Sequence, residues 1–114
     1  MIVPSSAQFS GCLIGQCLGD ALGFPVEGEG PDTCRRYVDD VLRAGWVGGG
    51  RGGFPFGQYT DDSQLARELL QSYVACGAFD VEDYAQRIAA IFEEHRIVGR
   101  GRATTRAARE LIRG

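Results

Sequence analysis

The sequence predicts an all-α fold from three observations. The longer segments place apolar residues three and four positions apart, which is the period of a helix with one buried face. No segment alternates apolar and polar residues convincingly, as a half-buried strand would. Capping residues and glycines separate the periodic segments, at the points where helices begin and end. We therefore expect about five helices in the 114 residues.

The first helix is expected over residues 9–23, which carry almost no charge. Glycine recurs there at every fourth position and forms one smooth stripe along a helix; its members are Gly11, Gly15, Gly19 and Gly23. Each glycine costs a helix about 1 kcal/mol relative to alanine. We expect the close approach of neighbouring helices to offset this cost, and so predict a central, buried helix. Asp20 in this segment needs partners, and both a structural role and a place in an active site remain open.

A loop bounded by glycine and proline is expected at 23–31, and a second helix over 32–44 that ends at Gly45. Glu27 lies in this loop, close behind the first helix, so it can overhang a cavity that this helix borders. Residues 46–57 are rich in glycine and contain no lysine, which excludes a phosphate-binding P-loop. They are either a plain connection or a cover over a site.

The stretch from Tyr59 to Gln64 places one hydroxyl and two adjacent carboxylates, those of Thr60, Asp61 and Asp62, at a predicted helix start. Hard oxygen donors of this kind suit Mg²⁺ or Ca²⁺. The same residue types cap the first N–H groups of a helix and favour its positive end. A metal site and a plain cap both remain open from these residues alone.

The third helix is expected over 61–76, with Gly77 ending it. Its apolar stripe predicts the core-facing residues Leu65, Leu69, Leu70, Tyr73 and Val74.

Asp80 is the expected N-cap of a fourth helix, in which Phe79 and Tyr84 form a hydrophobic staple. His95, the one histidine, lies near the end of this helix without a surrounding catalytic motif. Thr104 or Thr105 is expected to cap a last helix that ends near Arg113. Its arginines form a solvated face or contact phosphate.

Composition narrows the class of protein. The net charge is −3 and all twelve basic residues are arginine, so we expect no nucleic-acid partner and no attraction to acidic membranes. No apolar run approaches the length of a membrane span, and residues 1–10 do not resemble a signal peptide. A cytoplasmic protein is predicted. The four cysteines lack metal-ligand spacing and are expected to be reduced core residues.

Two stretches, in this order, resemble the ADP-ribosylglycohydrolase family. Residues 15–27 read GQCLGDALGFPVE and resemble the family's opening pattern, G-x-x-x-G-D-x-x-G-x-x-x-E. Residues 57–63 read GQYTDDS and resemble its T-D-D-T segment, with Ser63 in the fourth place. The tail at 99–114 is similar to the family's next helix. The resemblance implies an orthogonal multi-helix fold, of which residues 1–114 would be the N-terminal part of a single domain.

The resemblance also implies an activity and a site. Members hydrolyse the glycosidic bond of ADP-ribose on a protein side chain, or of a related small ADP-ribosyl compound, with two divalent cations, Mg²⁺ or Mn²⁺. Thr60, Asp61 and Asp62 would be metal ligands, and Glu27 and Asp62 would be catalytic. Glu27, Gly57 and Tyr59 would contact the substrate.

The residue types suit this chemistry. Cleavage of a riboside develops positive charge at the anomeric carbon. Paired metals can hold the ribose hydroxyls and acidify a water, while a carboxylate such as that of Glu27 acts as general acid or base.

One departure bears on completeness. The family completes its metal site with a D-x-D-T motif that these 114 residues lack. We therefore expect an N-terminal portion whose C-terminal remainder is a partner, and weak metal binding and association of these residues in isolation. The alternatives are an inactive, family-like module that binds partners, and a generic helical domain without a site.

Overall fold

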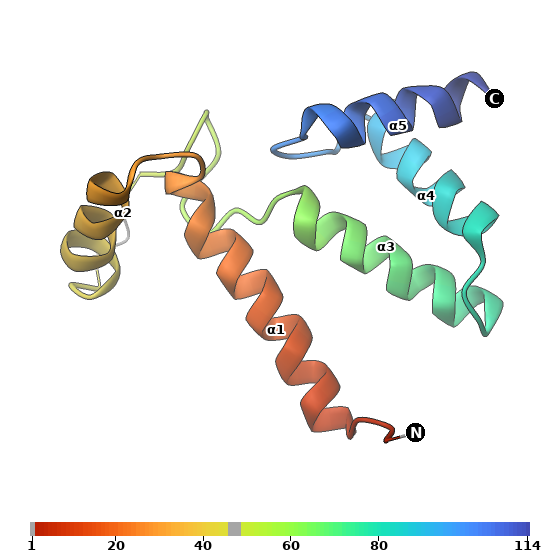
Figure 1. Cartoon of the computed structure of the whole chain (residues 1–114), viewed down its shortest axis with the longest axis horizontal. Coiled ribbons are helices and arrows are strands. Elements are labelled where there is room, and N and C mark those ends of the chain that lie inside the picture. The colour runs from red at the N-terminus through yellow and green to blue at the C-terminus, as the bar shows by residue number, and fades with distance from the viewer. Residues whose placement is uncertain (1, 46–48) are drawn as a thin grey trace. The chain divides into compact units, whose positions relative to one another are not determined.

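The structure is a computed structural model that describes residues 2–45 and 49–114. Within these residues it has five α-helices and no strand, so the all-α prediction is confirmed (Figure 1). The first three residues of the predicted glycine-rich loop, 46–48, lie outside the described residues. The chain forms two compact units, 1–59 and 60–114, and each is described by itself below. No helix in the described ranges is both long and apolar enough to cross a membrane.

In the first unit, α1 covers Ser6–Gly23 and begins three residues before the predicted start. The reason is a capping box: the Ser5 hydroxyl accepts from the Gln8 N–H at 3.2 Å, and the Gln8 side chain accepts from the Ser5 N–H at 2.9 Å. The prediction of a buried helix is wrong for this unit, because none of the α1 residues is buried. No described neighbour lies within 4 Å of a Cβ placed on its stripe glycines, 11, 15, 19 and 23.

The predicted loop after α1 contains a 3-10 turn, η1, at Phe24–Val26. The second predicted helix is divided into α2, Pro31–Tyr37, and a π-helical turn, η2, at Val38–Leu42. Gly45 ends it with a φ of 68°, as expected of a residue that follows a helix in the left-handed conformation. The Tyr37 hydroxyl donates to the Leu22 carbonyl at 2.7 Å and so ties α2 back to the end of α1.

Residues 51–54 form a tight turn within the glycine-rich segment. Arg51 and Phe54 form a single antiparallel bridge, with the Phe54 N–H donating to the Arg51 carbonyl at 2.9 Å. The two central residues, Gly52 and Gly53, have φ values of 55° and 84°, which suits a type I′ turn. Gly50 has no room for a side chain, because a Cβ there would lie 1.5 Å from the Phe54 carbonyl oxygen.

In the second unit, α3 covers Asp61–Cys76 with the predicted bounds, and Gly77 ends it at φ 73°. Its predicted core face is wrong in part: Tyr73 and Val74 are exposed, while Gln64, Glu68 and Ser72, spaced by four, are buried. Two of these three buried polar side chains have partners, while the buried Ser72 hydroxyl has no hydrogen-bond partner among the described residues. Gln64 pairs with backbone groups, and the Glu68 carboxylate lies close enough to Arg87 of the next helix for its charge to help raise that residue's pKa, after the larger contribution of the Asp83–Arg87 hydrogen bond.

The next helix, α4, covers Val81–Glu93 and packs against both α3 and α5 (Figure 1). Its predicted start is confirmed: the Asp80 carboxylate accepts from the N–H groups of Glu82 and Asp83 at 3.0 and 2.9 Å. The rings of Phe79 and Tyr84 lie 6.5 Å apart, as the staple requires.

The last helix, α5, covers Arg102–Arg113. The predicted threonine cap is wrong, because the helix begins after Gly101 and the Thr105 hydroxyl donates within it to the Gly101 carbonyl at 2.8 Å. The buried apolar residues of this unit are Ile91 and Phe92 of α4, Val98 of the following loop and Ala108 of α5.

All four cysteines are free, as predicted, but their predicted burial is wrong. Cys34 is half-buried, and Cys12, Cys17 and Cys76 are exposed.

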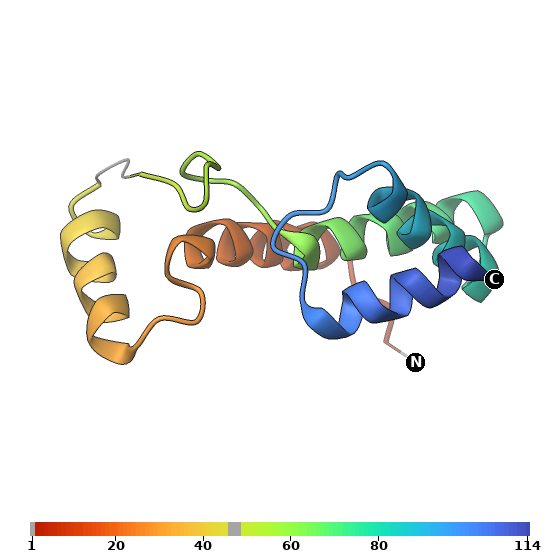
Figure 2. The ribbon, with the colours of Figure 1, turned by 90° about the horizontal axis from the view of Figure 1, so that it is seen from above.

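The end of α4 is a Schellman motif built on an unusual residue. The N–H of Arg96 donates to the Ile91 carbonyl at 3.0 Å, and that of His95 to the Phe92 carbonyl at 3.2 Å. His95 is the one described non-glycine residue with a positive φ, 54°. The left-handed turn at His95 sends the chain from α4 back toward the start of α3 (Figure 2).

His95→Gly is expected to stabilise the protein by about 0.5–1 kcal/mol. The substitution removes the cost of about 1–2 kcal/mol that a side chain imposes on a left-handed residue. Glycine offsets about 0.5–1 kcal/mol of this gain, because it has more conformational entropy to lose on folding. Thermal unfolding measures the effect as a rise of a few degrees in Tm. His95→Ala is the control and should show no rise, because it retains the strain. A fall in Tm for the glycine variant would contradict this account of the turn.

Candidate metal-binding active site

The predicted metal ligands lie at the first turn of α3. Thr60 stands at the N-cap position in extended conformation and is 3% exposed. Asp61 is half-buried, and Asp62, the predicted ligand and catalytic residue, is exposed. The three side chains therefore differ in accessibility although they are consecutive.

The Thr60 side chain makes no capping hydrogen bond. The first N–H of the helix, that of Asp61, donates to the Val98 carbonyl at 2.8 Å. A backbone group from the loop after α4 thus satisfies one of the four N–H groups that have no partner within the helix. The capping interpretation of Thr60 is therefore wrong, while the metal-ligand interpretation stays a prediction.

Gln64 joins the same turn to the same loop. Its Nε2 donates to the Arg96 carbonyl at 2.7 Å, and its Oε1 accepts from the Val98 N–H at 2.9 Å. With the Asp61–Val98 bond, three hydrogen bonds join the first turn of α3 to residues 96–98. Gln64 and Val98 are 9% and 8% exposed, so solvent competes little for these bonds.

In the first unit, Glu27 occupies the corner of a tight turn. Its φ and ψ of −57° and 126°, followed by Gly28 at φ 76°, match a type II turn, and the Glu29 N–H donates to the Val26 carbonyl at 3.0 Å. The Glu27 side chain is exposed, which suits a group that meets a substrate.

Arg51 fixes the backbone of this turn. Its Nη1 donates to the carbonyls of Phe24, at 3.2 Å, and Glu27. Its guanidinium carbon also lies 5.7 Å from the centre of the buried Phe24 ring, which Phe54 contacts from 6.1 Å. Arg51, packed on Phe24, thus fixes the backbone at Glu27. Arg51 itself lies in the tight turn in which Gly50 has no room for a side chain.

The two remaining predicted substrate contacts lie just before α3. Gly57 has a φ of 88° and is exposed. Tyr59 is 44% exposed, and its carbonyl accepts from the Gln58 side chain at 2.8 Å. Both positions are exposed and therefore accessible to a substrate.

The site residues thus fall into two groups. Glu27, Gly57 and Tyr59 belong to the first unit, and Thr60, Asp61 and Asp62 to the second. Within the described ranges, no three histidine, cysteine or acidic side chains are gathered as a metal cage. The donors at the start of α3 match a hard cation in chemistry, but a hydroxyl and two carboxylates fall short of the six oxygens of Mg²⁺.

Sequence reasoning missed Gln64 and Arg51. Each pairs with backbone groups more than twenty residues away, and no spacing rule marks such a contact. One signal in the sequence could have indicated Gln64: its amide closely follows Thr60, Asp61 and Asp62, the candidate ligands at the same helix start.

Comparison with known proteins places the chain in a family. The family model described as ADP-ribosylglycohydrolase matches residues 4–114. This chain belongs to the ADP-ribosylglycohydrolase family. ADP-ribosylhydrolase ARH3 of Gallus gallus is 34% identical over 96% of the chain and 31% of its own length. ADP-ribosylarginine hydrolase Tri1 of Pseudomonas putida is 33% identical over 99% of the chain and 30% of its own length.

The chain covers only part of each of these relatives. An uncharacterized protein of Archaeoglobus fulgidus is 32% identical over 94% of the chain and 34% of its own length. The chain therefore spans about a third of the length of the curated relatives that it matches. No solved structure matches the chain significantly.

Gln64→Leu is expected to lower the free energy of unfolding by about 2 kcal/mol, because it leaves the buried Val98 N–H and the Arg96 carbonyl without partners. Hydrogen exchange should show the loss locally, as faster exchange of the Asp61 and Val98 amides. Gln71→Leu is the matched control, since Gln71 is exposed on the same helix. Equal effects of the two variants would contradict the role given to Gln64.

Arg51→Met is expected to speed exchange of the Glu29 amide by about tenfold, because hydrogen bonds to a charged donor contribute about 1.5–3 kcal/mol and part of that holds this turn. Arg36→Met, at an exposed arginine of α2, is the control. Unchanged protection of Glu29 in Arg51→Met would show that the turn is held by its own backbone alone.

Proposed function

We propose that the protein is a metal-dependent hydrolase of ADP-ribosyl compounds. It cleaves the glycosidic bond between ADP-ribose and a protein side chain, or that of a related small molecule. These 114 residues supply the N-terminal part of its catalytic domain, and a C-terminal portion supplies further acidic ligands. The relatives in Gallus gallus and Pseudomonas putida are both named as ADP-ribosyl hydrolases, which supports this assignment.

The observation that carries the proposal is the fixed start of α3. The first N–H of the helix, that of Asp61, donates to the Val98 carbonyl, and the Thr60 side chain makes no capping hydrogen bond. The three bonds to residues 96–98 fix the direction in which the Asp61 and Asp62 carboxylates leave the helix. Pre-organised hard-oxygen donors of this kind suit one or two divalent cations.

In the proposed mechanism, Thr60 would hold a cation through its hydroxyl, and Asp61 and Asp62 would do so through their carboxylates. When bound, Mg²⁺ or Mn²⁺ would orient the ribose hydroxyls and acidify a water. Asp62, the most accessible of the three, would act beside the anomeric carbon as a catalytic carboxylate.

Glu27 acts as general acid or base on the scissile bond, and its exposed side chain on a fixed turn is suited to this task. Gly57 allows close backbone approach of the substrate, and Tyr59 offers an exposed ring beside it.

The metal proposal is tested by calorimetric titration of the assembled protein with Mg²⁺. Asp61→Ala/Asp62→Ala is expected to weaken binding by at least about 100-fold, because two charged ligands are lost and even outer-shell changes cost 10–100-fold. Asp39→Ala/Asp40→Ala is the matched control, because these adjacent aspartates are exposed on η2. Unchanged affinity in the Asp61/Asp62 variant would reject these ligands.

A second measurement separates chemistry from metal binding. Glu27→Gln should lower kcat for release of ADP-ribose by about 10²–10⁴-fold, the usual contribution of a general acid or base, with the Mg²⁺ affinity unchanged. The alternative function, an inactive module that binds partners, predicts no hydrolysis by the assembled wild-type protein and no effect of either variant on it.

A further inference from the structure

Five arginines gather at the C-terminal end of the second unit. We call them the α5 arginine surface: Arg100, Arg102, Arg106, Arg109 and Arg113. Between residues 100 and 113 they are accompanied by a single carboxylate, that of Glu110. The local charge is therefore +4 in a chain whose net charge is −3, which leaves −7 for the remainder. The positive charge is therefore concentrated in this segment, although the chain as a whole is negative.

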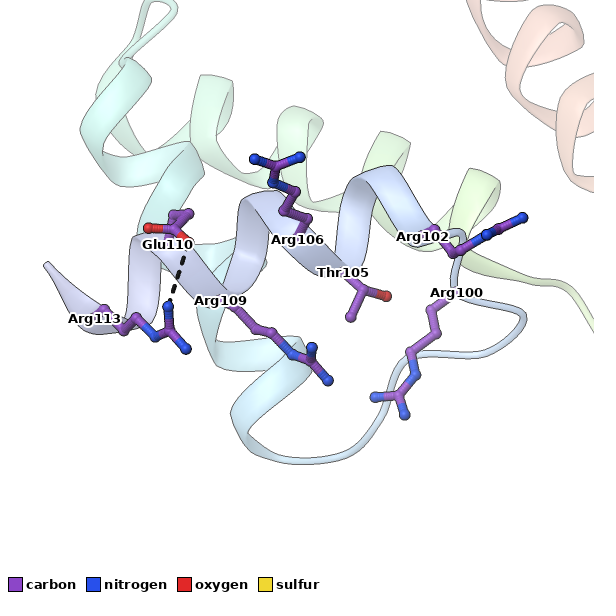
Figure 3. Close-up of a pocket in the computed structure, with 7 residues that line it drawn as sticks. All are labelled: Arg100, Arg102, Thr105, Arg106, Arg109, Glu110 and Arg113. Carbon is purple, nitrogen blue, oxygen red and sulfur yellow. Dashed lines mark hydrogen bonds and ion pairs between the residues drawn. The ribbon is translucent and has the colours of Figure 1, made fainter.

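The four arginines within the helix start from one face of it. Positions 102, 106, 109 and 113 follow intervals of four, three and four, which keep residues on one face of a helix. The opposite side of α5 is anchored by the fully buried Ala108, where the helix packs against α4. All five arginines are exposed, and with Thr105 and Glu110 they line a shallow hollow of about 550 Å³ (Figure 3).

Figure 3 shows how the side chains around the hollow are oriented. Arg100, from the loop before the helix, and Arg109, from its third turn, extend to the same side of Thr105. The Glu110 carboxylate is turned toward Arg113. The centre of the hollow is therefore lined by guanidinium groups without a carboxylate between them.

Ion pairs among the described residues do not neutralise this surface. Arg43 and Arg87 each meet a carboxylate within 3 Å, those of Asp39 and Asp83. In the α5 arginine surface, only Arg113 has one within 4 Å among the described residues, that of Glu110 at 3.5 Å, and both side chains are about two-thirds or more exposed. An exposed pair of this kind contributes at most about 1 kcal/mol. Among the described residues, no ion pair relieves the mutual repulsion of the remaining guanidinium groups, and an anion would do so.

We propose that the α5 arginine surface binds an acidic segment of another protein. Carboxylates accept paired hydrogen bonds from guanidinium groups, which makes arginine well suited to them. Twelve helical residues extend for about 18 Å, the length of five or six residues of extended peptide. A long nucleic acid fits less well, because the net charge of −3 gives these 114 residues no general attraction to it.

The test measures binding of a fluorescein-labelled peptide of about ten glutamates to the protein by fluorescence anisotropy. Arg106→Glu/Arg109→Glu is expected to weaken binding by at least about tenfold, because reversal places like charges against the peptide. Arg106→Lys/Arg109→Lys should retain binding to within about threefold, since the charge remains and only the paired geometry is lost. Both positions are exposed, and an unchanged helix signal in circular dichroism shows that the variants fold.

The control is Arg35→Glu/Arg36→Glu, which changes the net charge equally at exposed arginines of α2. It should leave the affinity within about twofold, because neither of these arginines belongs to the α5 arginine surface. Three results would overturn the proposal. These are no binding of the peptide at low salt, an equal loss in the control variant, and tighter binding of a labelled single-stranded oligonucleotide of equal charge through Arg106 and Arg109. None of these readouts depends on metal binding or hydrolysis, so failure here leaves the proposed function standing.

Discussion

Gln64 joins the first turn of α3 to residues 96–98, and the candidate metal ligands depend on this contact. The amide spans a donor and an acceptor on the same short stretch of backbone, at 2.9 and 2.7 Å. The Val98 carbonyl then returns a third bond to the Asp61 N–H. The loop between α4 and α5 therefore fixes the backbone of the first turn of α3. The oxygen-bearing side chains of Thr60, Asp61 and Asp62 extend from this fixed backbone.

The first unit uses a related device at Glu27. A long side chain from a distant segment, that of Arg51, donates to the carbonyls of a turn and fixes the residue at its corner. In both units, the site residue lies on a turn whose backbone is satisfied by a side chain far away in sequence. The glycines of the 50–53 turn make this possible, because Gly50 faces backbone and Gly52 and Gly53 adopt positive φ. We infer that turn geometry, more than helix packing, sets the positions of the candidate site residues.

Local signals in the sequence predicted the helices well. The bounds of α3 followed from Asp61 and Gly77, and the start of α4 from Asp80 with the Phe79 and Tyr84 staple, because caps act within a few residues. Which face of a helix is buried depends on its neighbours. The prediction therefore failed for the glycine stripe of α1 and for Tyr73 and Val74 of α3. Gln64 and Arg51 were not foreseen, because their partners lie 24 to 34 residues away.

The central claim is that the fixed turn at Thr60–Asp62 binds a divalent cation. Paramagnetic Mn²⁺ tests it most directly, because it broadens the amide signals of nearby residues in a ¹H–¹⁵N NMR spectrum. On titration with Mn²⁺, the account predicts that the signals of residues 60–63 and of the adjoining 96–98 are lost first. Early loss at the acidic start of α4, residues 80–83, with those of 60–63 retained, would contradict it.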